Sequence, residues 1–245
     1  MSIAITEEHR ALAATAADFL DRHDARGGAR ALLEAADEPL PPWWGDLAAL
    51  GWLGLHVPED RGGSGYGLEE LVVVVEQLGR AVAPGPFVPT TIASALLART
   101  DGSVGAELLG GLADGSIVAG VDHAGAVEVR SGTATGDAGN VLGGGQADVV
   151  VLPAGEDVAV VRVGDGVSVE VPANLDPTRR TARVRLDGAA AAVLPGARRL
   201  LVDLARVVLA AEATGMARAC TEMAAAYARE RIQFGRPIGT FQAVK

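Results

Sequence analysis

The pattern of apolar and polar positions divides the chain into three parts. Over residues 1–114, apolar side chains recur every three or four positions, the period of a helix with one buried face. Over residues 115–195 the apolar residues form short valine-rich runs, typical of strands. The helical period then returns. We predict an α+β multidomain fold: an N-terminal all-helical domain over residues 1–114, a middle antiparallel, barrel-like β-domain over 115–195, and the start of a C-terminal helical domain over 196–245.

The first predicted helix has Thr6 as its N-cap and acidic residues in its first turn. Four consecutive valines, 72–75, are compatible with a strand, but the flanking sequence favours a buried helix over 68–79. Further helices are predicted at a segment that includes residues 31–33, at 41–51, at 90–99 and at 105–113. The three tryptophans are expected to fill the core between these helices rather than to form a ligand cage; they are Trp43, Trp44 and Trp52.

The middle part contains seven predicted strands, separated by Gly, Asp, Asn or Pro. They cover residues 117–121, 126–130, 133–135, 149–152, 158–163, 167–171 and 181–186. The pair Asp165-Gly166 predicts a hairpin between the fifth and sixth strands. From residue 197 a single helix is predicted to run to about residue 230, a length of roughly 45–50 Å.

Composition narrows the function classes. No apolar run approaches the roughly 18 residues that span a bilayer, and the first residues lack the pattern of a signal peptide, so we expect a soluble cytoplasmic protein. The net charge of −10 disfavours nucleic-acid binding. The single cysteine, Cys220, lies among apolar helical positions, which predicts a buried, inert thiol. We expect no disulfide and no metal site.

The last seventeen residues combine three arginines with an aromatic ring and an amide. Gly and Pro residues interrupt the helical pattern here, which predicts a helix, a turn and a new helix. Forked guanidinium groups bind phosphate oxygens and a ring can stack, so the turn suits a flat, anionic ligand. Spacing alone favours the alternative, a basic helical hairpin with solvated arginines. The side chains concerned are Arg229, Arg231, Phe234, Arg236 and Gln242.

Several motifs resemble the acyl-CoA dehydrogenase family along the whole chain. They are LGWLGL at 50–55 with VPE at 57–59 and GGSG at 62–65, EQLGR at 76–80, and RIQFGRPI at 231–238 followed by Phe241-Gln242. The resemblance implies FAD at a subunit interface and α,β-dehydrogenation of an acyl-CoA thioester. In that reaction a carboxylate removes the α-proton and the flavin accepts the β-hydride. It also implies that Arg231, Phe234 and Gln242 contact the pyrophosphate and adenosine part of FAD in a neighbouring subunit.

The sequence departs from the family pattern where the flavin ring should bind. Family members carry a TEPxxGSD-like loop after the first strand, whereas here the chain runs VAGVDHAG over residues 118–125. Asn140 and Leu142 stand where the family has a Trp and a Thr against the flavin, and Leu142 has no hydrogen-bonding side chain. The resemblance therefore predicts a weak or missing site for the flavin ring.

The catalytic base is also missing from the sequence given. A minority of the family carries a glutamate before an arginine in the long helix, and here that pair is Ala205-Arg206. Most members have the base further along the C-terminal helices, so we expect the chain to stop inside that helical bundle. Glu212 is a poor candidate because nothing pairs it with a flavin site. His123 beside Asp122 is expected to be a turn residue rather than a substitute base.

These departures resemble the degenerate partner subunit of bacterial heteromeric acyl-CoA dehydrogenases used in steroid catabolism. The main hypothesis is a non-catalytic subunit that completes a FAD site in another subunit. The first alternative is a self-sufficient, homo-oligomeric flavoenzyme of fatty-acid or other lipid metabolism, with its base in later residues. The second is a non-enzymatic scaffold. The expected partners are an acyl-CoA substrate, another acyl-CoA dehydrogenase subunit, and an acceptor of the electron-transfer-flavoprotein type.

Overall fold

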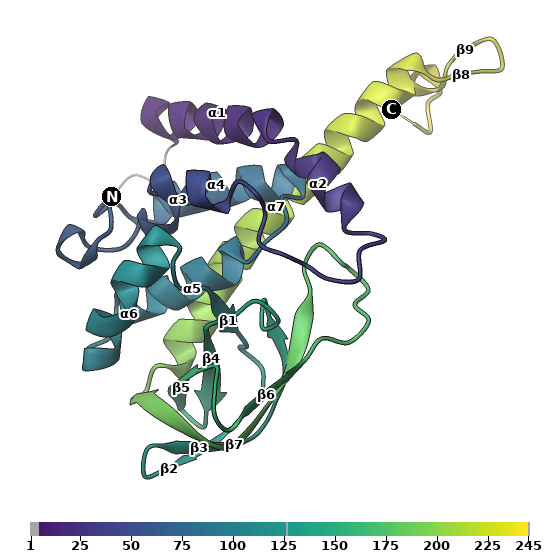
Figure 1. Ribbon diagram of the computed structural model, residues 1–245. Helices are drawn as coiled ribbons and strands as arrows, with labels where there is room; N and C mark the ends of the chain where they lie inside the picture. The colour runs from purple at the N-terminus through teal and green to yellow at the C-terminus, as the bar shows by residue number, and fades with distance from the viewer. Residues whose placement is uncertain (1–4, 126, 245) are drawn as a thin grey trace.

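A layer of helices packs against a β-sheet, and one long helix runs past both (Figure 1). The computed structural model describes residues 5–125 and 127–244. None of the helices described is long and apolar enough to cross a membrane. The helices of the first layer are α1 Glu7–Arg22, α2 Ala25–Ala31, α3 Trp44–Ala49, α4 Leu68–Ala81, α5 Phe87–Leu97 and α6 Ser103–Asp114, with short 3₁₀ turns η1 Trp52–Gly54 and η2 Glu59–Arg61.

The helical layer is built around α5, all of whose residues are buried. The helix prediction for residues 68–79 is confirmed by α4, which buries Leu71, Val74, Val75 and Leu78. The predicted capping of the first helix is also confirmed, because the Thr6 hydroxyl accepts the His9 amide. All three tryptophans are buried in the core, as expected.

The sheet contains seven strands in the order β2-β3-β1-β4-β5-β7-β6, with a further pairing of β3 to β7. Among the strands of the described residues, β1 and β4 pair in parallel and the other pairings are antiparallel. The strands are β1 Ala119–Val121, β2 Glu128–Arg130, β3 Thr133–Leu142, β4 Val149–Ala154, β5 Asp157–Arg162, β6 Val167–Glu170 and β7 Thr181–Leu194. Ala126, in the predicted second strand, lies outside the described residues.

Three details of the middle region differ from the sequence prediction. The third and seventh strands are longer than predicted, because β3 and β7 pair with each other through Leu142 and Thr181. The predicted hairpin at Asp165-Gly166 is wrong. The strands on either side of that turn, β5 and β6, both pair with β7 instead of with each other, at residues 191–194 and 183–186 respectively.

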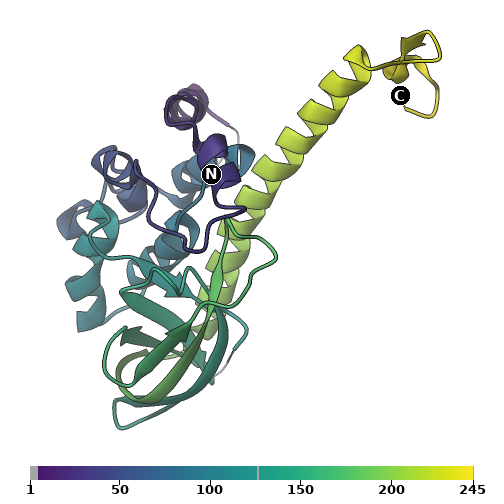
Figure 2. The same ribbon diagram turned by 45° about the vertical axis from the view of Figure 1, so that its right-hand side comes forward.

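The last helix, α7 Arg198–Glu230, is 33 residues long. Its first half packs against the helical layer, and its last buried residue is Ala219. Beyond this point it projects away from the body, and its tip lies at the far end of the molecule from the sheet (Figure 2). We call residues 220–244 the arm. Cys220 is exposed at the base of the arm, so the prediction of a buried thiol is wrong.

The loop between β6 and β7 joins the three parts of the fold. Arg179 forms an ion pair with Glu212 of α7, and both side chains are largely buried. The next residue, Arg180, donates 2.6 Å hydrogen bonds to the carbonyls of Ala35 and Ala36 in the linker after α2. This loop therefore fixes the sheet to α7 and to the helical layer at adjacent positions.

Candidate functional site

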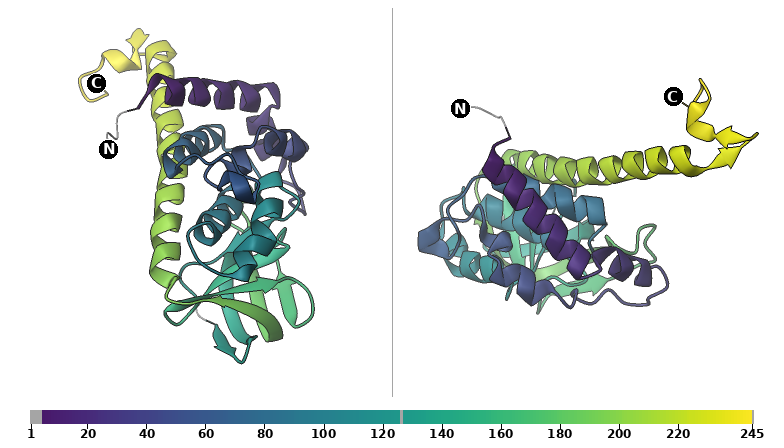
Figure 3. Two further views of the ribbon diagram at one scale, coloured as in Figure 1. Left: turned by 90° about the vertical axis from the view of Figure 1, so that its left-hand side faces the viewer. Right: turned by 90° about the horizontal axis from the view of Figure 1, so that it is seen from above.

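The tip of the arm is a small hairpin rather than a second helix. After α7, the strands β8 Ile232–Gln233 and β9 Arg236–Pro237 pair with each other, and the 3₁₀ turn η3 Ile238–Thr240 follows. The predicted new helix is therefore wrong within the described residues. The physical reason is that cross-strand bonds satisfy the backbone, among them one from the Ile238 amide to the Arg231 carbonyl. Two views at right angles show the hairpin standing clear of the body (Figure 3).

The three residues predicted to contact FAD all lie on this tip. Arg231, Phe234 and Gln242 are all exposed, and the Phe234 ring is 93% exposed. Among the described residues, the side chains of Arg231 and Gln242 make no hydrogen bond, so their donors are free for a ligand. Such an exposed set of a guanidinium, a ring and an amide fits a nucleotide diphosphate.

Two neighbouring residues give the hairpin its shape, and the sequence interpretation assigned Phe241 no such role. The Arg236 guanidinium lies 4.1 Å from the centre of the Phe241 ring, a cation–π contact. Phe241 also meets Phe234 edge to face at 6.2 Å. Arg236 is therefore engaged in holding the hairpin, whereas Arg231 is not.

Within the body, the turn after β1 has its described backbone donors occupied, so none of these is free for a flavin ring. The carboxylate of Asp122 accepts hydrogen bonds from the amides of His123, Ala124 and Gly125, at 2.7, 3.1 and 2.6 Å. Asp122 is only 7% exposed. The sequence predicts that the flavin-binding loop is missing. The structure adds that the backbone amides of the short turn in its place already donate to Asp122.

The facing end of β3 offers few groups for the flavin ring. Leu142 is half-buried against the main core, and Asn140 is exposed. His123 is an exposed turn residue, as predicted. The occupied amides of the Asp122 turn and the apolar Leu142 thus leave few donors for a flavin ring, whereas the exposed guanidinium, ring and amide of the arm suit a nucleotide diphosphate.

Neither of the two positions considered for the catalytic base, Ala205 and Glu212, offers a free carboxylate. Ala205 is 1% exposed, within the hydrophobic core. Glu212 is 5% exposed, and the Nε atom of Arg179 donates a 2.7 Å hydrogen bond to its carboxylate. A carboxylate held in a buried ion pair serves to join α7 to the β6–β7 loop.

One concavity was not predicted from the sequence. A bowl of about 660 Å³ lies between the linker after α2 and the β6–β7 loop. Its wall includes the exposed side chains of Leu33 and Leu175 and the carboxylate of Glu38. Burial raises the pKa of Glu38, although the positive charges of Arg179 and Arg180 lower it in part. No motif marks this surface, because it forms only when two distant irregular segments meet.

The sequence matches two domains of one family. The family "Acyl-CoA dehydrogenase, N-terminal domain" matches residues 6–116, and "Acyl-CoA dehydrogenase, C-terminal domain" matches residues 197–245. Acyl-CoA dehydrogenase FadE34 of Mycobacterium tuberculosis is 42% identical over 83% of this chain and 28% of its own length. Acyl-CoA dehydrogenase IpdE2 of the same organism is 34% identical over 98% of this chain. The chain spans 28% of the first relative and 69% of the second.

Two solved structures share the whole arrangement. The Tcur3481-Tcur3483 steroid ACAD has a TM-score of 0.87 and 30% identity, over 98% of this chain and 72% of that one. The ChsE4-ChsE5 complex from Mycobacterium tuberculosis has a TM-score of 0.87 and 27% identity, over 99% of this chain and 72% of that one. The order of helices, sheet and long helix, the RIQFGRPI hairpin and these similarities lead to one conclusion: the chain belongs to the acyl-CoA dehydrogenase family, whose members use FAD.

Proposed function

We propose that this chain is a non-catalytic subunit of a heteromeric acyl-CoA dehydrogenase and completes the FAD site of an unlike subunit. The observation that carries the proposal is the separation of the two halves of the expected site. Arg231, Phe234 and Gln242 lie on an exposed arm that projects from the body, whereas the β1 and β3 ends expected to face the flavin ring lie within the body (Figure 1). One copy of this chain cannot bring the two halves together.

Each residue of the arm has a distinct part in the proposed site. The Arg231 guanidinium binds the pyrophosphate of FAD in two-point contact, the Phe234 ring stacks on the cofactor, and the Gln242 amide binds an adenosine edge. Bound FAD supplies the hydride acceptor for α,β-dehydrogenation of an acyl-CoA thioester. In this proposal the base that removes the α-proton belongs to the unlike subunit; of the positions considered in this sequence, Ala205 has no carboxylate and Glu212 is held in an ion pair.

The substrate class is proposed from the relatives, and the electron acceptor from the family resemblance of the sequence. One matched structure is a steroid ACAD and another is a complex of two differently named subunits. We therefore propose a bulky acyl-CoA thioester, such as one with a steroid side chain, and an acceptor of the electron-transfer-flavoprotein type. The proposed site of action is the cytoplasm.

Flavin content tests the proposal directly. The chain is purified alone and after coexpression with an unlike acyl-CoA dehydrogenase subunit, and FAD is measured by absorbance. We expect stoichiometric FAD only in the assembly. In that assembly Arg231→Ala should weaken FAD binding about tenfold or more, since charge-assisted contacts contribute about 1.5–3 kcal/mol. Arg199→Ala, at an exposed arginine near the other end of α7, is the matched control.

Three outcomes separate the alternatives. Stoichiometric FAD in the chain alone, with turnover of acyl-CoA by an artificial acceptor, would establish the self-sufficient enzyme and contradict the partner role. Unchanged FAD in the Arg231→Ala assembly would support a scaffold that takes no part in cofactor binding. Loss of FAD from that assembly, with none lost from the Arg199→Ala assembly, supports the proposal.

A further inference from the structure

The arm is carried by α7 across a point where two helix backbones touch. Gly215 of α7 faces the Glu76 carbonyl of α4, and Gly79 of α4 faces the Glu212 carbonyl of α7. A Cβ atom on either glycine would overlap the facing oxygen. The crossing therefore acts as a pivot near the middle of α7, with the arm as a lever beyond it.

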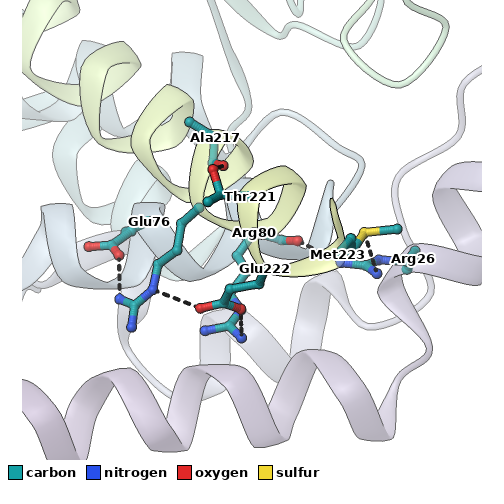
Figure 4. A network of polar contacts seen from close by, with 8 residues as sticks. Arg26, Glu76, Arg80, Ala217, Thr221, Glu222 and Met223 are labelled. Atoms are coloured by element: carbon teal, nitrogen blue, oxygen red, sulfur yellow. Dashed lines mark hydrogen bonds and ion pairs between the residues drawn. The ribbon is translucent and has the colours of Figure 1, made fainter. Parts of the chain in front are cut away.

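Ionic contacts hold α7 on both sides of this pivot. Before it, the buried pair Arg179–Glu212 joins α7 to the β6–β7 loop. After it lies an exposed network that we call the α4–α7 clamp, drawn in Figure 4. In the clamp, Arg218 contacts Glu76 and Glu222, both at 3.2 Å, and Glu222 also contacts Arg80 at 2.5 Å. The clamp consists of Glu76, Arg80, Arg218 and Glu222.

A third helix supports the clamp from the side. Arg26 of α2 donates a 2.9 Å hydrogen bond to the Arg80 carbonyl and lies 3.8 Å from the Met223 sulfur (Figure 4). Among the described residues, no hydrogen bond or ion pair joins α7 to another element of the body beyond Met223. The clamp and the adjoining Arg26–Met223 contact are thus the last polar supports before the free length of the arm.

The clamp contributes little to folding stability, but it lies where a small tilt of α7 causes a large displacement of the tip. Its side chains are 28–56% exposed, and exposed pairs typically contribute about 0–1 kcal/mol each. From Gly215 to Glu230 is about 15 residues, or about 22 Å, so a tilt of about 10° moves the helix end by about 4 Å. Binding groups need placement within about 0.5 Å, far less than this movement.

We propose that Glu222, which bridges Arg80 and Arg218, is a positioning residue that fixes the direction of the arm and so the presentation of Arg231 and Phe234. The cofactor part of this inference rests on the proposed function; the direction of the arm does not. Because the clamp is exposed, Glu222→Gln removes its charge without leaving a buried group unpaired. The folded body should therefore remain intact in this variant.

The direction of the arm is measured by pulsed electron spin resonance. Cys220 is the chain's one cysteine, so a Cys220→Ser background accepts nitroxide labels at Leu175→Cys on the body and Thr240→Cys on the tip. We expect Glu222→Gln to shift the distance distribution between the labels by about 4 Å, or to broaden it by as much. This value corresponds to a tilt of about 10° over the lever length of about 22 Å. The melting temperature should stay within about 2 °C.

The matched control breaks another exposed ion pair. Glu107→Gln removes the 2.5 Å contact to Arg162 between α6 and β5, whose side chains are similarly exposed. It should leave the label distance unchanged. Raising NaCl to 1 M, where the Debye length is about 3 Å, should move the parent distribution towards that of Glu222→Gln and have a smaller effect in the variant, which keeps only the Arg218–Glu76 pair. An unchanged distance in Glu222→Gln overturns the inference, whatever the flavin content.

Flavin content of the coexpressed assembly then tests the consequence for the cofactor. We expect Glu222→Gln to retain several-fold less FAD after dialysis than Glu107→Gln. A moved arm with full FAD retention overturns the positioning role. If Arg231→Ala retains all of its FAD while Glu222→Gln moves the arm, the proposed function is wrong. The role of Glu222 in fixing the direction of the arm is then still supported.

Discussion

Phe234 has a left-handed backbone, with φ at 51°, and a ring that is 93% exposed. A non-glycine residue in this region costs about 1 kcal/mol or more, and an exposed ring gains little from the fold in return. Such strain is typical of functional positions. The conformation itself belongs to the tight turn with Gly235, which also has a positive φ.

Phe234→Asn tests the contribution of the ring without changing the backbone conformation, because Asn tolerates the left-handed region. The chain's free energy of unfolding should change by less than about 0.5 kcal/mol, since almost no ring area is buried. FAD affinity of the assembly should fall about tenfold, the equivalent of about 1.4 kcal/mol of stacking. Fluorescence titration measures the affinity. The exposed Tyr66→Asn is the matched control, and equal losses in both variants would contradict the assignment.

His56 predicts a pH dependence of stability. It is 4% exposed, its Nε2 lies 2.9 Å from Ser94 Oγ, and its Nδ1 has no partner among the described residues. Burial, with a further contribution from Arg99, lowers the pKa of His56 to about 4. The unfolded chain binds this proton below about pH 6.5, and the folded chain does so only below about 4. Stability is therefore full above pH 6.5 and falls towards pH 4, by about 3 kcal/mol in total.

Urea unfolding at pH 7.5 and pH 5 measures this effect. In wild type the stability lost between these pH values should exceed the loss in His56→Gln by about 2 kcal/mol, because the variant lacks the group. His123→Gln, made at an exposed turn, should keep the wild-type loss. Identical losses in wild type and His56→Gln would exclude His56 as the source.

At the scale of elements, helix α7 depends on a close crossing with α4. The contact buries little side-chain volume but brings two backbones together at Gly79 and Gly215. This is the place where helix propensity and packing disagree, since glycine is unfavourable in a helix interior. The packing requirement prevails.

Gly215→Ala should destabilise the chain by about 3 kcal/mol, because the added methyl group meets the Glu76 carbonyl and the helices must separate. Gly110→Ala makes the same change in α6, where nothing lies within 4 Å, and should stabilise by about 1 kcal/mol. Urea unfolding midpoints compare the two. A stabilised Gly215→Ala would show that the crossing is not tight.

Much of the helical layer could be predicted from the sequence, because local period and caps decide it, as in α1 and α4. The extents of β3 and β7 could not. Gly136, Gly139 and the alanines after Gly188 carry no strand signal, and only pairing with the opposite strand makes them extended. The arm residues were found through the motif, but their distance from the sheet depends on the length and direction of α7, which no local pattern records.

At the scale of the whole molecule, the chain consists of a packed body and an arm beyond it (Figure 3). The body holds the residues that stabilise the fold, and the arm holds those proposed to bind FAD. A segment with few buried contacts opens easily, so the local stability of the arm should be lower than that of the body.

Limited trypsin digestion of the chain alone should cut first after Arg229 or Arg231, because these exposed sites lie at the unsupported end of α7. Exposed Arg10, within the packed helix α1, should be cut later. Mass spectrometry identifies the order. Coexpression with the unlike subunit should protect the arm, and equal cutting in the free and assembled chain would argue against its burial in the complex.

The turn at Asp122 has a consequence for how such a subunit can stay folded. Shortening a loop normally leaves backbone amides without partners, and each buried one costs about 1–3 kcal/mol. Here one carboxylate accepts three of them. Under the proposed function, this aspartate lets a chain without the flavin loop keep its described turn amides paired and its fold stable.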